Sequence, residues 1–340
     1  MKALIAMSGG VDSSVAVQLT KNAGYEALGC TLLLCEGGKE GVEDAKRVAD
    51  ALSVPLSVFD LQDRFKEEIV LPFMESYRRG MTPNPCVLCN QRIKFGWLFE
   101  KAEALACDLL VTGHYARIVK EGEHFLLKKA RDEAKDQSYM LYTLKESMLS
   151  RLSFPLGEYT KEEIRALADS LSLPNAKKKD SQDICFIENG RYAERIEEIF
   201  GKSPIGDYID KEGKVLGKHR GLIHYTVGQH KKLGISFPTP LYVLSLLPAE
   251  NQVVLGSNED LYTKTVHVPL FSFIASEGAP ADTFRAKAKI RYRQKEEPCT
   301  VTVCGDGVTI EFDSPQRAVT PGQSAVLYDG DTVLGGGIIQ

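Results

Sequence analysis

The chain has 340 residues, of which 43% are hydrophobic and 26% are charged, a composition typical of a globular protein with more than one core. Its formal net charge of −4 gives no overall attraction for nucleic acid, so any such partner depends on local patches. No run approaches the roughly 20 apolar residues of a membrane span. The apolar start "MKALIAMSGG" is too short for an export signal, so we expect a cytoplasmic protein with no membrane partner.

The first half of the sequence alternates between strand-like and helix-like segments. Short apolar runs predict strands over residues 3–7, 25–34, 55–61 and 108–114. Helical periodicity predicts helices over residues 13–24, 41–53, 65–79, 89–106 and 159–171. The last of these opens with a capping box formed by Thr160 and Glu163. The alternation predicts a mainly parallel sheet with helices on both faces, a Rossmann-like α/β domain over residues 1–204.

The pattern becomes β-rich after residue 204. Residues 205–264 are rich in glycine and contain short strand-like pieces, which predicts a small central linking β domain. Residues 265–340 include the alternating stretch "VTVCGDGVTIEF", with a turn at residues 305–307. They predict a small C-terminal β-barrel, so the expected architecture is an α/β domain followed by two β-rich domains.

The stretch "MSGGVDSS", residues 7–14, joins the first predicted strand to the first predicted helix. Gly9 and Gly10 let backbone N–H groups approach an anion, and the helix N-terminus that follows attracts phosphate. Asp12 would repel phosphate unless a cation lay between them, which implies Mg²⁺. The loop lacks the Gly-Lys-Ser/Thr ending of a Walker A motif and resembles the PP-loop of ATP pyrophosphatases. The alternative is an ordinary Gly-rich turn between a strand and a helix.

Two of the eight cysteines have flanks that suggest reactivity. Cys89, in "NPCVLCNQRIKF", is expected near the N-terminus of the helix that follows, where Arg92 and Lys94 would also lower its pKa. Cys185, in "KKKDSQDICFI", follows three lysines in a loop. Each could therefore act as a nucleophile at neutral pH.

The other thiols have simpler interpretations. For Cys30, Cys107, Cys299 and Cys304 the alternative is a small buried apolar side chain. The pair Cys86 and Cys89 could also be half of a zinc site, but no second Cys-x-x-Cys exists to complete the usual four ligands.

The stretch "RAKAKIRYRQK", residues 285–295, has a cation at every second position. In a strand these six side chains would share one face without an acidic neighbour, a surface suited to nucleic-acid phosphates. The alternative is a solvated edge strand that lysines protect from aggregation.

Taken together, the motifs resemble the bacterial tRNA-specific 2-thiouridylases, a family of the PP-loop ATP pyrophosphatase superfamily with an adenine nucleotide alpha hydrolase-like domain. The resemblance covers nearly the whole chain. In order, it includes "MSGGVDSS", "NPCVLCNQRIKF", "TGHYARI", "KDQSYMLYTL", "KKKDSQDICFI", "GLIHYTVGQHKKLGI", "RYRQ" and "TPGQSAVLYDG".

The resemblance implies an ATP-dependent 2-thiolation of the wobble uridine of tRNA. ATP would adenylate the C2 oxygen of the uridine, and a persulfide on Cys185 would deliver the sulfur. Cys89 would be the nucleophile that releases this sulfur, leaving a Cys89–Cys185 disulfide. The implied sulfur source is a sulfur-carrier protein or a cysteine desulfurase. In the alternative route, hydrosulfide is freed first.

The resemblance also implies which residues bind the two substrates. The expected ATP-binding residues are Ala6, Met7, Ser8, Gly9, Gly10, Val11, Asp12, Ser13, Leu32 and Gly113. The expected tRNA-binding residues are Asn84, Pro85 and Cys86 at the flipped-out base, with His114, Lys135, Asp136, Gln137, Arg291, Tyr292 and Gln323 elsewhere on the tRNA.

The sequence departs from the family pattern in two places. Cys86 stands where many relatives have Asp, so a role for that Asp cannot be transferred. Cys86, Cys89 and Cys185 could instead hold a 4Fe–4S cluster whose open iron binds hydrosulfide. His230 and Lys232 replace the more usual Arg and Gly, which keeps positive charge.

Two rival functions remain at this point. One is a PP-loop synthetase that forms an amide on a small molecule and does not need Cys89 and Cys185. The other is a metal-stabilised RNA-binding module without catalysis, whose Gly9 and Asp12 would tolerate mutation.

Overall fold

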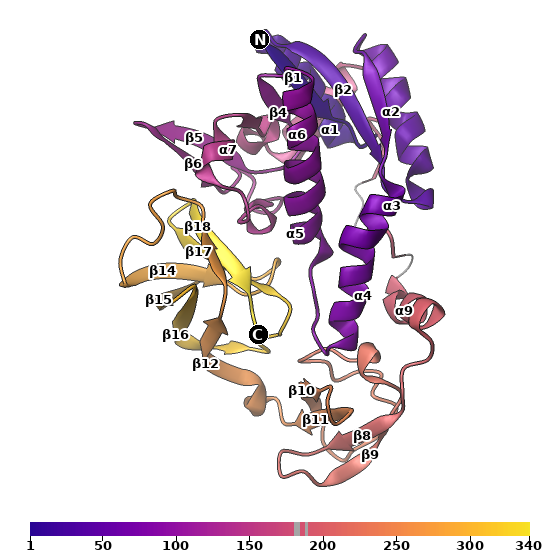
Figure 1. The fold of residues 1–340 in the computed structure, drawn as a ribbon, viewed down its shortest axis with the longest axis vertical. Coiled ribbons are helices and arrows are strands. Elements are labelled where there is room, and N and C mark those ends of the chain that lie inside the picture. Colours follow the sequence, from indigo (N-terminus) through magenta and orange to yellow (C-terminus); the bar gives the residue numbers. More distant parts are fainter. Residues whose placement is uncertain (180–183, 188–189) are drawn as a thin grey trace.

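The computed structural model describes residues 1–179, 184–187 and 190–340 (Figure 1). The α/β domain occupies the upper part of Figure 1, and the two β-rich parts lie below it. None of the helices in these residues is long and apolar enough to cross a membrane.

The N-terminal domain is built on a five-stranded sheet with the strand order β3-β2-β1-β4-β7, in which every pairing is parallel. The strands are β1 (Lys2–Ala6), β2 (Glu26–Leu33), β3 (Leu56–Asp60), β4 (Leu109–Val111) and β7 (Leu152–Ser153). Each observed strand overlaps a predicted one except the short β7. The parallel α/β architecture predicted from the sequence is confirmed.

Helices cover both faces of this sheet. Successive β1 side chains point to opposite sides, and apolar residues on each side pack against helices. Ala3 and Ile5 pack with α1 (Val11–Asn22), α2 (Lys39–Ala51) and α8 (Lys161–Ser170). Leu4 packs on the other face with α6 (Leu98–Ala104). The capping box predicted for Thr160 and Glu163 is present at the start of α8, with both hydrogen bonds formed.

Two helical runs of this domain contain π-helical segments. The first comprises α3 (Gln62–Phe65), a π-helix (Lys66–Val70) and α4 (Leu71–Arg78). The second comprises α5 (Pro85–Cys89), a π-helix (Asn90–Trp97) and α6. The second run begins at Pro85, four residues before the predicted start, because the Asn84 side chain caps it. Shorter helices are α7 (Glu146–Leu149) and α9 (Tyr192–Phe200).

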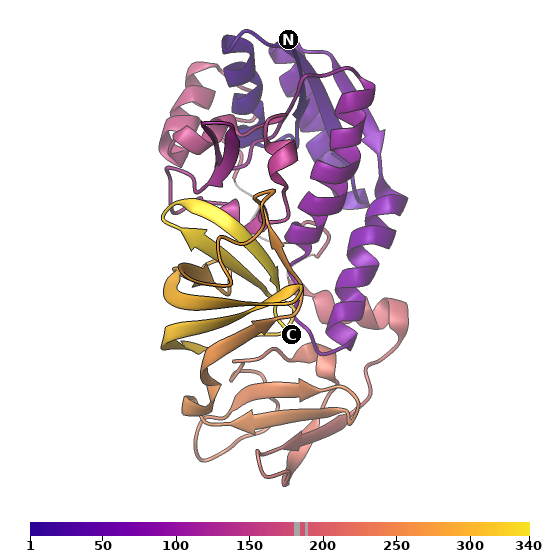
Figure 2. The same cartoon turned by 60° about the vertical axis from the view of Figure 1, so that its left-hand side comes forward.

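The central β domain has a four-stranded sheet in the order β10-β11-β8-β9. Its strands are β8 (Gly206–Ile209), β9 (Val215–His219), β10 (Tyr242–Leu247) and β11 (Gln252–Gly256). It forms the lower end of the molecule in Figures 1 and 2. Helix α4 reaches down to it, where Phe73 and Tyr77 share an apolar cluster with Ile223 and residues of α9.

The C-terminal domain is antiparallel and joins a hairpin from the first domain. Its strands are β12 (Tyr262–Val268), β13 (Phe271–Phe273), β14 (Thr283–Lys289), β15 (Glu297–Cys304), β16 (Gly307–Arg317), β17 (Ser324–Asp329) and β18 (Thr332–Ile338). The hairpin of β5 (Arg117–Glu121) and β6 (His124–Lys128) extends this sheet through the pairing of Thr332 with Lys128. The curved sheet lies beside the α/β domain in Figure 2.

The prediction of one basic strand over residues 285–295 is wrong. Strand β14 ends at Lys289, and a turn follows in which the Gln294 N–H donates to the Arg291 carbonyl at 3.2 Å. The alternation that would align all six cations therefore stops halfway. The face is not free of acid either, because Arg285 forms a two-pronged ion pair with Asp313.

Candidate active site

The loop between β1 and α1 is held in a tight fold by serine hydroxyls. The Ser8 N–H donates to Ser13 Oγ at 3.1 Å, and Ser13 Oγ donates to the Gly10 carbonyl at 3.0 Å. Gly9 has φ +73°, and a Cβ added there would lie 2.2 Å from the Gly41 carbonyl oxygen. Helix α1 has no side-chain cap at Gly10. Its first N–H groups are therefore available to an anion.

The strand order places this loop where a nucleotide is expected. Strands β2 and β4 flank β1 on opposite sides, and ligands of open parallel sheets bind at the carboxyl ends where the order reverses. Gly113, just after β4, lies against the start of α1, and a Cβ there would be 2.9 Å from the Ser13 nitrogen. Both glycines thus let backbone segments approach more closely than a side chain would allow. Ala6 ends β1, and Leu32 lies near the end of β2.

Asp12 has a cationic partner within the protein. Lys161 Nζ lies 2.7 and 2.8 Å from the two Asp12 carboxylate oxygens, and the Tyr115 hydroxyl donates to Asp12 Oδ1 at 2.8 Å. Lys161 is the first residue of α8 and only 8% exposed. The sequence did not identify it as a site residue. Its one available signal was the capping box that fixes where α8 begins.

Asn175 is a second site residue that the sequence did not reveal. Its Nδ2 donates to the Gly9 carbonyl at 3.0 Å and to Ser14 Oγ at 2.9 Å. Its Oδ1 is buried and has no hydrogen-bond partner among the described residues. A donor on a ligand in the loop could satisfy this oxygen.

Cys86 and Cys89 both lie on α5, but not as predicted. The Asn84 side chain accepts a hydrogen bond from the Cys86 N–H at 3.1 Å, so Cys86 occupies the first turn and Cys89 the end of α5. Cys89 is only 9% exposed, and burial raises its pKa while Lys94 partly lowers it. Arg92, which was expected to lower this pKa as well, donates through Nη1 to the Glu68 carbonyl at 3.5 Å. The predicted low-pKa thiolate at Cys89 is therefore wrong.

Cys185 is brought to Cys89 by its neighbour Phe186. The Phe186 ring makes edge contacts with Phe65 and Phe73, at 5.6 and 5.3 Å between ring centroids. Phe186 packs against the apolar cluster that contains Cys89. Desolvation raises the pKa of Cys185 to about 12, helped by the thiols of Cys89, Cys86 and Cys35 and opposed by Lys94. Residues 180–183 of its sequence motif lie outside the described residues.

Lys94 is the cation shared by these thiols. It lowers the pKa of Cys86, Cys89 and Cys185, and within the described chain it forms no ion pair. Its Nζ lies 3.4 Å from His114 Nε2, and the other ring nitrogen of His114 pairs with Thr112 Oγ1 at 2.7 Å. Burial and Lys94 hold the pKa of His114 well below its usual range. His114 is therefore neutral at pH 7 and can accept from the Lys94 ammonium.

The C-terminal domain contacts the segment that leads into α5. The Thr82 N–H donates to the Pro321 carbonyl at 2.8 Å, and Gln323 Nε2 donates to the Thr82 carbonyl at 2.6 Å. Tyr292 is close enough to Cys86 for that thiol to raise its pKa, after the larger effects of burial and Asp136. The structure therefore brings Tyr292 and Gln323 near residues 82–86.

Several expected tRNA-binding side chains have partners within the protein. Asp136 accepts hydrogen bonds from the Ala130 N–H and from Ser138. Gln137 Oε1 accepts from the Tyr115 N–H at 2.9 Å. Arg291 donates to the Ala318 carbonyl at 2.7 Å and to Thr320 Oγ1 at 2.6 Å. Lys135 lies partly exposed in the same loop as Asp136.

The cysteines do not fit a metal or cluster site. Across residues 1–179, 184–187 and 190–340, no group of three or more His, Cys, Asp or Glu side chains is arranged to hold a metal ion. All eight cysteines are free thiols. The arrangement supports neither the zinc site nor the three-cysteine 4Fe–4S alternative.

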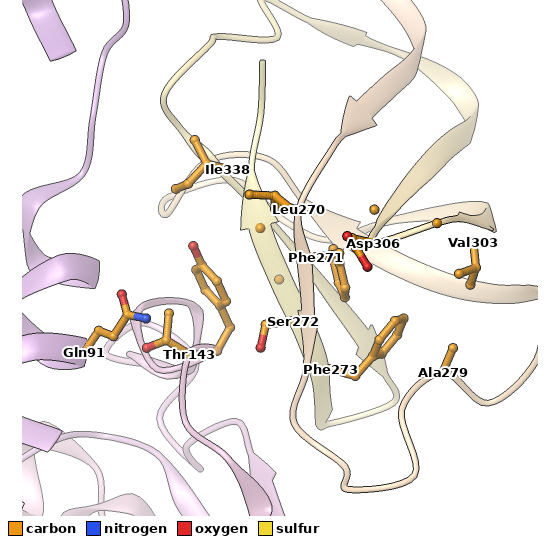
Figure 3. Close-up of a pocket in the computed structure, with 15 residues that line it drawn as sticks. Gln91, Thr143, Leu270, Phe271, Ser272, Phe273, Ala279, Val303, Asp306 and Ile338 are labelled. Atoms are coloured by element: carbon orange, nitrogen blue, oxygen red, sulfur yellow. The ribbon is translucent and has the colours of Figure 1, made fainter. Parts of the chain in front are cut away.

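A separate cavity of about 570 Å³ lies where the two larger domains meet (Figure 3). Gln91 and Thr143 line one side, and residues 270–273 of the C-terminal domain line the other. Its described lining includes Asp306 but no cationic side chain. It is therefore poorly suited to a phosphate group.

Comparison with protein families divides the chain into three segments. A family described as the tRNA methyl transferase HUP domain matches residues 1–189. The tRNA methyl transferase PRC-barrel domain matches residues 194–257, and the aminomethyltransferase beta-barrel domain matches residues 263–339. These matches agree with the predicted succession of an α/β domain and two β-rich domains.

Full-length relatives are similar throughout. The tRNA-specific 2-thiouridylase MnmA of Clostridioides difficile (strain 630) is 42% identical over 354 residues, covering 100% of this chain and 98% of the relative. That of Syntrophotalea carbinolica (strain DSM 2380 / NBRC 103641 / GraBd1) is 45% identical over 345 residues, covering 99% and 97%.

Among solved structures the likenesses are distant. The U34-tRNA thiolase NcsA from Methanococcus maripaludis, solved with its 4Fe–4S cluster, is 18% identical with a TM-score of 0.36, over 58% of this chain and 65% of that one. A 4-thiouridine synthetase, solved with RNA and bound ATP, is 21% identical with a TM-score of 0.36, over 58% and 50%.

Proposed function

Because the chain belongs to the family of tRNA-specific 2-thiouridylases, we infer that it catalyses the ATP-dependent 2-thiolation of uridine in tRNA. One structural observation carries this function: residues that support the phosphate loop and a cysteine beside Cys89 lie close together in the sequence. Asn175 donates to the Gly9 carbonyl, and Lys178 pairs with Asp44 beside Gly9. Cys185, seven residues after Lys178 in the sequence, lies near Cys89. An amide-forming synthetase would have no use for these thiols.

We propose that the phosphate loop activates the uridine. Residues 6–13, with Leu32 and Gly113, would hold ATP so that the C2 oxygen of the uridine attacks the α-phosphorus and pyrophosphate leaves. The uncapped N–H groups of α1 would bind the phosphates. Asp12 would hold Mg²⁺, which would supply positive charge to the phosphates when bound. Lys161 pairs with both oxygens of the Asp12 carboxylate and orients it.

The sulfur would be transferred by Cys185 and Cys89. The terminal sulfur of a Cys185 persulfide attacks C2, and AMP leaves. Cys89 then attacks the Sγ of Cys185. The bond between this Sγ and the sulfur on C2 breaks, which releases the thiolated tRNA and leaves a Cys89–Cys185 disulfide. A reductant must cleave this bond before another cycle. The persulfide would be loaded in the cytoplasm by a sulfur-carrier protein or a cysteine desulfurase.

The uridine would enter beside α5. Enzymes that modify a base must reach it outside the stack. Asn84, Pro85 and Cys86 start α5 next to Tyr292 and Gln323, so we propose that this junction between domains receives the base of the wobble uridine. His114, Lys135, Asp136, Gln137 and Arg291 would position the surrounding tRNA, directly or through the loops that they hold.

Gly9→Ala tests this function together with its ATP site. We expect formation of both 2-thiouridine and AMP to fall by at least about tenfold, because alanine is strained at this φ and its Cβ meets Gly41. Both products would be measured with purified protein, tRNA, ATP and a persulfide donor. Gly37→Ala is the matched control, since nothing lies within 4 Å of its added Cβ. Equal activity in the two variants would contradict the assignment.

Arg293 and Arg291 should affect tRNA binding in different ways. Arg293 is exposed after β14, so Arg293→Gln should weaken tRNA binding and reduce the salt slope by about one. Arg291→Gln should instead lower the melting temperature, because it removes bonds to Ala318 and Thr320. Binding titrations at several salt concentrations measure the first effect. If the salt dependence of tRNA affinity were unchanged in Arg293→Gln, the Arg293 side chain would contact solvent and not tRNA.

A further inference from the structure

A fourth cysteine lies at the proposed sulfur-transfer site. Cys35 follows β2, and its Sγ lies 3.8 Å from the Cys185 carbonyl oxygen. Within the described residues, no other cysteine sulfur contacts the backbone of Cys185. The Cys35 thiol also raises the pKa of Cys185, after the larger effects of burial, Cys89 and Cys86, so the two side chains lie near each other. The reaction proposed above gives Cys35 no role.

The same apolar cluster holds Cys35, Cys89 and Cys185 in place. Cys89 belongs to this cluster, and Leu34 and Phe186 pack against it. Leu34 directly precedes Cys35, and Phe186 directly follows Cys185. Two neighbouring anchors in one cluster therefore fix the two cysteines beside each other and beside Cys89.

The three thiols differ in their access to solvent. Cys89 is buried, Cys35 is partly exposed and Cys185 is exposed. A reductant in solution can therefore reach Cys35 and Cys185 but not Cys89. Moving the disulfide away from Cys89 would place both of its sulfurs where a reductant can attack.

We propose that Cys35 is the resolving thiol of Cys185, which accepts the disulfide left by sulfur transfer and so frees Cys89. The Cys35 thiolate, formed by loss of its proton to solvent, attacks the Cys185 sulfur of the Cys89–Cys185 disulfide. The Cys35–Cys185 bond forms as the Cys89–Cys185 bond breaks. Cys89 leaves as a thiolate and takes up a proton, so no net oxidation occurs. A dithiol reductant then supplies two electrons to cleave the Cys35–Cys185 bond. This inference rests on the proposed function.

A single turnover without reductant tests the exchange. Wild-type protein carrying a persulfide is mixed with ATP and tRNA, and free thiols are alkylated in denaturant so that buried thiols also react. The non-reduced peptides are then analysed by mass spectrometry. We expect peptides linked through Cys35–Cys185, with Cys89 partly alkylated. Peptides that link Cys89 to Cys185 alone, or to Cys86, would overturn the proposal. Cys86 is the competing thiol, because it is exposed and lies three residues before Cys89.

Cys35→Ser gives a kinetic test. The first turnover should be unchanged, but steady-state turnover with a dithiol should be about tenfold slower, since an external thiol at low concentration replaces an intramolecular one. Cys304→Ser, an exposed cysteine of the C-terminal domain, is the matched control. An unchanged steady-state rate in Cys35→Ser would overturn the proposal. The 2-thiouridine formed in the first turnover separates the two hypotheses. If wild-type protein forms no 2-thiouridine, the proposed function is refuted. If it forms 2-thiouridine without a Cys35–Cys185 link, only the role of Cys35 is refuted.

Discussion

Cys185→Ala should abolish 2-thiouridine formation, with a loss of at least about 1000-fold, while the protein still binds ATP and tRNA. Without this sulfur no persulfide can form at position 185. Among the described cysteines, only Cys185 adjoins Phe186, whose packing holds it beside Cys89. Because the side chain is exposed, its truncation should leave the melting temperature nearly unchanged. Mass spectrometry of digested tRNA and a tRNA-binding titration measure the two effects.

The stage at which Cys185→Ala fails is informative. Adenylation precedes sulfur transfer, so pyrophosphate release dependent on tRNA should persist in this variant. Cys107→Ala is a suitable control, since Cys107 is buried and belongs to a different apolar cluster from that of Cys89. Thiolation retained in Cys185→Ala would refute the persulfide route. Loss of tRNA binding would instead assign Cys185 a binding role.

Features encoded by neighbouring residues were predictable from the sequence. The phosphate loop, the strand-helix alternation and the capping box at Thr160 depend on local patterns, and the structure contains each of them. The two cysteines proposed for sulfur transfer could be singled out by their polar and basic flanks. Their proximity could not be derived in this way, because it depends on Phe186 packing onto α3 and α4.

The errors arose where distant residues determine the environment. Lys161, which reaches Asp12 from α8, was missed. Cys89 was expected to be a low-pKa thiolate near a helix start, but Asn84 moves that start to Pro85 and the cluster that contains Ile93 buries the thiol. The cations of residues 285–295 alternate in sequence, yet a turn after Lys289 breaks the strand. Charge spacing alone could not reveal that turn.

The sequence showed Lys94 only as a charge near Cys89. The backbone geometry explains why Lys94 affects both His114 and the thiols. The π-helical segment that starts at Asn90 follows Cys89 directly, and its i→i+5 bonding favours the alignment of residues five apart. Lys94 lies five residues after Cys89. The wider turn therefore helps to place its ammonium group between His114 and the thiols.

Lys94→Met should slow sulfur transfer by about tenfold or more, because the thiols lose the cation that favours their ionised form. Burial already raises the pKa of Cys89 and Cys185, so at neutral pH both are protonated and their reactivity should rise with pH. Lys94 lowers both pKa values, so its removal should shift the profile further toward high pH. Each unit of that shift reduces the thiolate fraction about tenfold at a given pH.

The pH dependence of alkylation by iodoacetamide measures this shift without requiring turnover. Lys94→Arg keeps the charge and should largely restore the profile, whereas a purely structural role would not be rescued in this way. Arg92→Gln removes a neighbouring charge from the same helix but one directed at Glu68, so its profile should match wild type. The pKa of His114, followed by NMR, should rise in Lys94→Met because the same cation now depresses it. Superimposable alkylation profiles for Lys94→Met and wild type would show that Lys94 does not govern the thiols.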